Sequence, residues 1–114
     1  MATLQNKVAL ITGGASGIGR KTAELFIKEG AKVCIADLNT ELGEQVVKEL
    51  GENAFFVKAD SSSPEDNRML VEKTIAKFGA LHIAVNNAGI GGASAVTGEY
   101  PLDEWHKVIN INLN

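Results

Sequence analysis

The sequence has 114 residues and a hydrophobic content of 45%, which is that of one compact domain rather than two. Its 11 basic and 14 acidic residues give a net charge of −3, which excludes a generally basic surface for binding nucleic acid. A lone cysteine, Cys34, excludes an internal disulfide, and residues 1–7 lack the apolar stretch of a signal peptide or membrane span, so we expect a cytoplasmic protein without a membrane or nucleic-acid partner.

Four short apolar runs alternate with segments of helical periodicity. The runs are continuous, which is typical of strands buried on both faces of a parallel sheet, and they cover 7–12, 32–36, 54–58 and 81–85. Helices are expected between them, because apolar residues recur there at helical spacing. Gly30 and Gly51 end the first two helices, and the segment 61–66, with a serine cap and Pro64 in the first turn, begins the third.

After the fourth strand, the segment 90–100 is expected to be a loop. Asp103 can then cap a last helix that carries Trp105, Val108, Ile109 and Asn112. Strands that alternate with helices in this way pair in parallel through right-handed crossovers. The predicted fold class is therefore α/β, a three-layer, Rossmann-like doubly wound parallel sheet of which the first four strands are present.

A glycine-rich loop, 12–19, connects the first strand to the first helix. At such a junction the backbone amides and the helix dipole bind phosphate. Gly13 allows the tight turn, Gly17 lets a ligand approach the backbone, and Gly19 lets the helix pack closely on the strand. Glycine-rich turns also arise simply to close a strand–helix connection, so the loop indicates a diphosphate site only in combination with other features.

Asp37 is the second feature that indicates a nucleotide. It ends the second strand about 20 residues beyond the glycines, where a carboxylate accepts hydrogen bonds from both hydroxyls of an adenosine ribose. A 2′-phosphate about 4 Å away would meet a repulsion of roughly 4 kcal/mol per charge pair, and none of Ala15, Ser16 and Leu38 is basic. Arg20, the nearest cation, is expected to face solvent or the diphosphate. The predicted cofactor is NAD in preference to NADP.

Every predicted strand is followed by a polar or glycine-rich feature at its carboxyl end. Asp60 follows the third strand, and the segment 86–89 follows the fourth. In a doubly wound sheet the strand order reverses beside the first strand, and the fourth strand lies on its other side. Gly89 and Gly13 would therefore flank the same crevice, where ligands bind in such sheets.

With these motifs in order, residues 7–114 resemble the classical short-chain dehydrogenase/reductase (SDR) family. The family's cofactor loop matches 12–13 and 17–19, its adenine-ring aspartate matches Asp60, and its Asn-Asn-Ala-Gly segment matches 86–89. The resemblance implies that the last of these steadies the central sheet and lines the nicotinamide ribose. We expect cofactor contacts at Gly13, Ser16, Gly17, Ile18, Gly19, Asp37, Leu38, Asp60, Ser61, Asn87, Ala88 and Gly89.

The resemblance also makes Asn112 the one member of the family's catalytic tetrad in this sequence. Its implied role is to bend the last helix locally and to hold a water that relays protons from an active-site lysine. Asn110 and His82 stand where aspartate is usual in the family, and neither change touches the cofactor loop.

The serine, tyrosine and lysine of that tetrad have no match here. The single tyrosine, Tyr100, is followed four residues later by Glu104, whose charge has the wrong sign to activate a phenol, and Pro101 interrupts the helix needed between them. Ser94 is expected to be a loop residue. We therefore expect residues 1–114 to be an NAD-binding Rossmann-fold domain truncated before the catalytic serine and Tyr-x-x-x-Lys. Alone it would be inactive, with its fourth strand left as an exposed edge.

These observations give three functional hypotheses. The first is an NAD-dependent oxidoreductase, a homo-oligomer when complete, that transfers a hydride between NAD(H) and a small-molecule alcohol or ketone. The second is a catalytically silent dinucleotide-binding or regulatory module, which the missing tyrosine–lysine pair motivates. The third, a methyltransferase, fits the glycine spacing poorly.

Two residue types invite other interpretations. His82 and His106 have no carboxylate or cysteine partner at ligand spacing, so no metal is expected. Cys34 lies in an apolar run, where a buried and unreactive thiol is expected.

Overall fold

The computed structural model describes residues 4–15, 17–60 and 62–86, together with the backbone of 109–112. Strands and helices follow one another in the order β1 (Val8–Thr12), α1 (Gly17–Lys28), β2 (Lys32–Asp37), α2 (Thr40–Leu50), β3 (Ala54–Lys58), α3 (Pro64–Phe78), β4 (Ile83–Asn86) and β5 (Ile109–Asn112). The first seven elements confirm the predicted alternation, with small shifts at their ends. The fourth strand, for example, was expected at 81–85.

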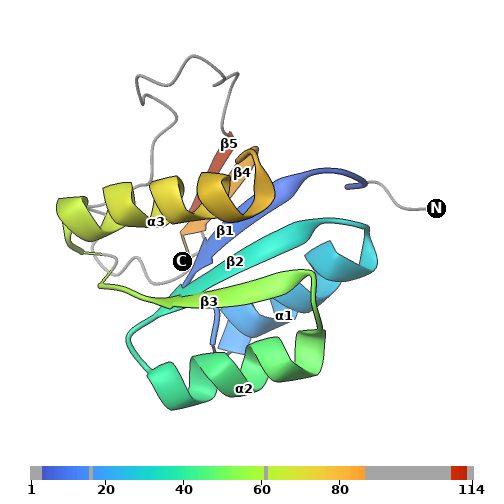
Figure 1. The fold of residues 1–114 in the computed structure, drawn as a ribbon. Coiled ribbons are helices and arrows are strands. Elements are labelled where there is room, and N and C mark those ends of the chain that lie inside the picture. The colour runs from blue at the N-terminus through green and yellow to red at the C-terminus, as the bar shows by residue number, and fades with distance from the viewer. Residues whose placement is uncertain (1–3, 16, 61, 87–108, 113–114) are drawn as a thin grey trace.

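The strands form one parallel sheet in the order β3-β2-β1-β4-β5. From β1 the chain moves outward to β2 and β3, and α3 then carries it back across the sheet to β4 on the other side of β1. Figure 1 shows α1 and α2 on one face of the sheet and α3 on the other. This is the predicted three-layer α/β architecture.

The continuous apolar runs fill two cores, one on each face of the sheet. Leu10 and Cys34 pack with Leu70 of α3. Their chain neighbours Ile11 and Ile35 pack on the opposite face, in the core that α1 and α2 cover. Because successive side chains of a strand alternate between faces, a strand buried on both sides needs apolar residues at every position. All five residues of β1 are accordingly buried.

The helices α2 and α3 follow β2 and β3 and begin at the carboxyl edge of the sheet, and a side chain caps each. The Oδ1 of Asn39 accepts a hydrogen bond from the Leu42 N–H at 3.0 Å. The Oγ of Ser63 accepts one from the Asp66 N–H at 3.2 Å, which confirms the predicted serine cap. Both caps satisfy amides that the helix itself leaves without partners, and they fix where each helix begins.

The chain segment expected as the end of a last helix is a strand. Residues 109–112 form β5, which pairs in parallel with β4 from Ile83↔Ile109 to Asn86↔Asn112. The prediction of a helix from Asp103 through Asn112 is therefore wrong over β5, and 103–108 lie outside the described residues. The sequence Ile-Asn-Ile-Asn has the period of two and the β-branched residues that suit a strand.

The prediction that β4 would be an exposed edge is wrong for the same reason. An edge strand presents a row of N–H and C=O groups, which β5 pairs. Residues 109–112 form a strand because their backbone pairs with the N–H and C=O groups of β4. The helical periodicity of this segment alone would also have allowed a helix.

His82 ties the amino edge of the sheet together just before β4. The imidazole Nδ1 of His82 accepts a hydrogen bond from the backbone N–H of Val8 at 3.0 Å. The backbone N–H of His82 donates to the Val8 carbonyl at 2.9 Å. An aspartate at this position would present a carboxylate oxygen to the Val8 N–H. The imidazole nitrogen supplies an acceptor in its place, on the edge opposite the predicted site.

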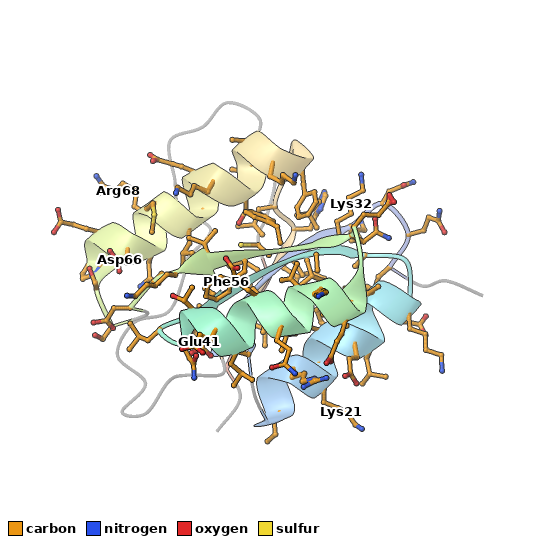
Figure 2. The ribbon with its side chains drawn as sticks, turned by 60° about the horizontal axis from the view of Figure 1, so that its bottom comes forward. Lys21, Lys32, Glu41, Phe56, Asp66 and Arg68 are labelled. Carbon is orange, nitrogen blue, oxygen red and sulfur yellow. The ribbon has the colours of Figure 1, made fainter. Side chains whose placement is uncertain are left out.

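The helix α2 approaches β3 closely at Gly43. A Cβ at that position would lie 2.1 to 2.6 Å from three atoms of the Phe56 ring, well inside van der Waals contact. Phe56 lies between β3 and α2 (Figure 2). Only glycine at position 43 lets the ring pack against the helix backbone in this arrangement.

Candidate functional site

The predicted site lies at the carboxyl edge of the sheet, beside β1, where the strand order reverses. Thr12, Asp37 and Asn86 end β1, β2 and β4, and Asp60 comes two residues after β3. Parallel strands present all their carboxyl ends at one edge, so these residues lie on the same side of the molecule. Ligands of open α/β sheets bind at this reversal point.

The first amides of the glycine loop are bonded to β2. The N–H groups of Gly13 and Gly14 both donate to the carbonyl of Ala36, at 2.7 and 3.3 Å. Gly13 has a φ of 66°, the left-handed conformation of a tight turn. Gly14 packs closely as well, since a Cβ there would lie 2.8 Å from Cγ2 of Ile35. The backbone N–H groups at the start of the loop are therefore already engaged in hydrogen bonds within the protein.

The second half of the loop is open. Gly17, the first residue of α1, has a φ of 60°, and a Cβ built on it would meet no atom within 4 Å. Ile18 follows with 62% of its surface exposed, whereas Gly19 is buried, as expected for a helix that packs closely on the sheet. The first N–H groups of an α-helix have no partner within the helix, so this turn presents amide donors and the positive end of a dipole.

Asp37 bridges the glycine loop and the turn that leads into α2. Its Oδ2 accepts a hydrogen bond from the Ala15 N–H at 3.2 Å, and its Oδ1 accepts one from the Asn39 N–H at 3.0 Å. The side chain is half-buried. An ionised carboxylate has about four acceptor positions, so these two contacts leave capacity for two further donors.

Asp60 is held in a tight turn before α3. Its Oδ1 accepts hydrogen bonds from the Ser62 hydroxyl at 2.6 Å and from the Ser62 N–H at 2.9 Å. These bonds, the hydroxyl above all, stabilise the charged form and lower the pKa of the Asp60 carboxyl. Asp60 is therefore ionised at neutral pH and acts only as an acceptor.

A cavity of about 260 Å³ joins these features. Leu38, 61% exposed, offers an apolar surface beside the two carboxylates. The cavity combines acceptors for hydroxyl or amino groups with an apolar wall, which suits a nucleoside. Its lining consists of Gly13, Ala36, Asp37, Leu38, Ala59, Asp60 and Ser62. A larger hollow of about 570 Å³ lies against α2 and β3, and none of the predicted site residues lines it.

Thr12 and Asn86 join β1 to β4 at the same edge. The hydroxyl of Thr12 lies 3.1 Å from Oδ1 of Asn86 and 3.3 Å from the Val85 carbonyl, so it shares its proton between them. Asn86 is only 3% exposed, and within the described part of the chain its Nδ2 has no hydrogen-bond partner. Among the described residues, the Asn86 amide therefore has one donor without a partner, at the edge where the predicted site lies.

Arg20 lies one turn into α1. Its guanidinium contacts Glu24 on α1 and Glu49 near the end of α2, and that end of α2 lies toward the amino edge of the sheet. The Arg20 side chain keeps 35% of its surface exposed, which agrees with the expectation that it faces solvent. Its charge is compensated by carboxylates.

Four of the predicted cofactor residues, Gly13, Asp37, Leu38 and Asp60, line one cavity, and 17–19 form the adjoining first turn of α1. Asn112 ends β5 in register with Asn86, so its backbone lies at the carboxyl edge, although on a strand and not on the helix that its implied role requires. The other predicted cofactor residues that the structure does not describe are Ser16, Ser61, Asn87, Ala88 and Gly89.

Sequence reasoning missed the hydrogen bonds that hold the site together. The contact of Asp37 with Asn39 follows the common pattern in which an aspartate side chain bonds the backbone two residues on, and Asp60 with Ser62 repeats it. That spacing is visible in the sequence. The contact of Asp37 with Ala15 depends on the pairing of β1 with β2 and has no local signal.

Among the described residues, no helix is both long enough and apolar enough to cross a bilayer. No group of three or more histidine, cysteine, aspartate or glutamate side chains in that part of the chain could hold a metal ion.

Comparison with known proteins identifies relatives over nearly the whole chain. A family model described as short chain dehydrogenase matches residues 7–114. Cyclohexanol dehydrogenase from Acinetobacter sp. (strain SE19) is 47% identical over 112 residues, which are 96% of this chain and 45% of that protein. Zerumbone synthase from Zingiber zerumbet is 46% identical over 114 residues, 97% of this chain and 43% of that protein. The chain thus spans less than half the length of these relatives.

A solved structure also resembles the fold. The crystal structure of 3-ketoacyl-(acyl-carrier-protein) reductase from Brucella melitensis complexed with NADH superposes with a TM-score of 0.74 at 48% sequence identity. The match covers 77% of this chain and 36% of the reductase chain.

Proposed function

The chain belongs to the short chain dehydrogenase family, and we propose that it forms the cofactor-binding half of an NAD-dependent oxidoreductase. The proposed reaction is hydride transfer between NAD(H) and a small-molecule alcohol or carbonyl compound. The observation that carries the proposal is the cavity at the carboxyl edge, which brings Asp37 and Asp60 together beside Gly13. The similarity to a reductase crystallised with NADH supports the same assignment.

The described residues suggest how the dinucleotide would be held. Since the amides of Gly13, Gly14 and Ala15 already donate to β2, we place the diphosphate on the amides at the first turn of α1, 17–19. The adenosine ribose would donate its hydroxyls to Asp37, and the base would lie against Leu38. Cofactor contacts at Ser16, Ser61, Asn87, Ala88 and Gly89 remain predictions.

The nicotinamide ring supplies the hydride chemistry when it is bound, and the residues of this chain bind and orient it. Asn112 remains a candidate for the family's catalytic asparagine, because β5 ends at the carboxyl edge beside β4. Its helix-bending role is not part of the proposal.

We infer a preference for NAD over NADP from the charges at the ribose end. A 2′-phosphate near the Asp37 carboxylate would be repelled by about 4 kcal/mol per charge pair at a separation of about 4 Å. Arg20 cannot offset this repulsion in the arrangement described, because its guanidinium is paired with Glu24 and Glu49. The ribose hydroxyls of NAD, in contrast, supply donors for the acceptor positions that Asp37 still has.

Calorimetric or fluorescence titration of the complete protein with NADH and NADPH tests the proposal. We expect NADH to bind at least about tenfold more tightly, since a hydrogen bond to a charged group is worth about 1.5 kcal/mol or more. Asp37→Ala should reduce that ratio by weakening NADH. Glu41→Ala is the matched control, because Glu41 is an exposed carboxylate in the first turn of α2 and does not line the cavity (Figure 2).

Two results would contradict the proposal. Tighter binding of NADPH by the unaltered protein would exclude the assigned role of Asp37, as would an Asp37→Ala variant that keeps the original ratio. Absence of binding of either nucleotide to the folded protein would exclude the oxidoreductase function altogether.

A further inference from the structure

The first turn of α3 contacts the site through Asp66. Ser63 caps this helix, and an acidic residue three positions after the cap commonly reaches back to the N–H of the capping residue. Asp66 does not. Its Oδ2 accepts a hydrogen bond from the Asp60 N–H at 2.8 Å, while the Ser63 N–H donates to the Asp60 carbonyl at 3.0 Å. The start of α3 therefore holds both backbone polar groups of Asp60.

The Asp60 turn is also attached to β2. The N–H of Ala59 donates to the Asp37 carbonyl at 3.2 Å, and Ser62 binds one oxygen of the Asp60 carboxylate. Asp60 and Ser62 line the cavity, whereas Asp66 does not. Figure 2 shows Asp66 at the beginning of α3, on the side of the molecule where α2 begins with Glu41. Asp66 therefore contacts the cavity lining through Asp60.

We propose that Asp66 is a positioning residue for the base-binding end of the site, where it fixes the Asp60 backbone so that the Asp60 carboxylate meets the exocyclic amino group of adenine. The inference rests on the proposed function. Asp60 lines the same cavity as Asp37, which is assigned to the ribose, and its two contacts with Ser62 leave acceptor positions unused. An amino group is the donor on adenine that such a carboxylate recognises.

Removal of Asp66 would leave the Asp60 N–H without its acceptor and would let the turn rotate. The carboxylate of Asp60 would then lose its alignment with the amino group, although it would remain ionised. The predicted consequence is specific: affinity falls only for nucleotides that carry the amino group. A purely structural role of Asp66 would lower affinity for every nucleotide to the same extent.

The test uses the complete protein and two nucleotides, NADH and its deamino analogue, in which hypoxanthine replaces adenine and an oxo group replaces the amino group. Dissociation constants are measured for the unaltered protein, Asp66→Ala and Asp66→Asn. Glu65→Ala is the matched control, because Glu65 is an exposed carboxylate in the same first turn of α3. Asp66→Ser, whose hydroxyl is too short to replace the carboxylate, is used if the alanine variant does not fold.

We expect the unaltered protein to prefer NADH over the deamino analogue by about tenfold, the contribution of one hydrogen bond to a charged acceptor. Asp66→Ala should bring the ratio close to one by weakening NADH alone. Asp66→Asn retains an oxygen acceptor and should keep most of the preference, and Glu65→Ala should keep all of it.

Three results would overturn the inference. An equal loss of affinity for both nucleotides in Asp66→Ala, with the ratio preserved, would show a structural role only. A ratio of one in the unaltered protein would exclude the contact between Asp60 and the amino group. Failure of the unaltered protein to bind either nucleotide would remove the proposed function, and the inference with it.

Discussion

Replacement of Gly17 by alanine distinguishes the conformational role of this glycine from its role as a ligand contact. Gly17 has a φ of 60°, and a Cβ on it would meet no protein atom within 4 Å. The left-handed conformation costs a non-glycine residue about 1–2 kcal/mol, so Gly17→Ala should lower the free energy of unfolding by about that amount. Gly79→Ala is the matched control. Gly79 has a φ of 88° and equally open surroundings, but it follows α3 at the amino edge of the sheet.

Binding should separate the two variants. If the diphosphate lies on the first turn of α1, the new methyl group of Gly17→Ala occupies space that the phosphates need. Such overpacking costs about 1–3 kcal/mol, or roughly 5- to 150-fold in affinity for NADH. Gly79→Ala should bind NADH as the unaltered protein does. The assays are urea denaturation and NADH titration of the complete protein.

Two outcomes would refute this placement of the diphosphate. The first is normal NADH affinity in Gly17→Ala together with the expected loss of stability. The second is an equal loss of affinity in both variants, because that loss would follow from general destabilisation and not from contact with the ligand.

Two further predictions concern the core. Gly43→Ala should lower the free energy of unfolding by about 1–2 kcal/mol, because the clash with Phe56 exceeds the roughly 1 kcal/mol of helix propensity gained; urea denaturation that shows equal or higher stability would mean that the ring moves aside. Burial raises the pKa of Cys34 to about 12 from its ordinary value of 9.0. The contribution of the Cys34 thiol to the free energy of unfolding is therefore fully present below pH 9 and is lost as the pH rises toward 12. The unaltered protein should lose stability more steeply over that interval than Cys34→Ala. Parallel slopes for the two proteins in pH-dependent denaturation would contradict this assignment.

The part of the fold from β1 to β4 could be predicted because several local signals agreed. Continuous apolar runs marked strands buried on both faces, and Gly30 and Gly51 follow the first two helices in conformations with positive φ, as expected. Ser63 capped α3 as its place before Pro64 indicated. Each of these signals lies within a few residues of the element that it specifies, so the chain need not be folded for the signal to be recognised.

β5 could not be predicted, because its conformation depends on a distant partner. Periodicity over 105–112 allows a helix, whereas the alternation within 109–112 allows a strand. The strand forms because residues 109–112 pair with β4, which lies far away in the sequence. The same limit explains why the contact between Asp66 and Asp60 was missed, since the sequence around Ser63 indicates an ordinary capping arrangement.

The hydrogen bonds of the site also restrict how its specificity can change. Asp37 has two tasks, because the carboxylate that would receive the ribose also accepts the Ala15 N–H from the glycine loop and the Asn39 N–H from the start of α2. A smaller neutral residue at position 37 would remove the repulsion of a 2′-phosphate, but it would leave the part-buried Ala15 N–H without its acceptor and loosen the loop beside the proposed diphosphate position. Relief of the charge therefore cannot by itself convert this site into a tight NADP site. Conversion also requires a new acceptor for the Ala15 N–H and a cation that, unlike Arg20, is not already paired.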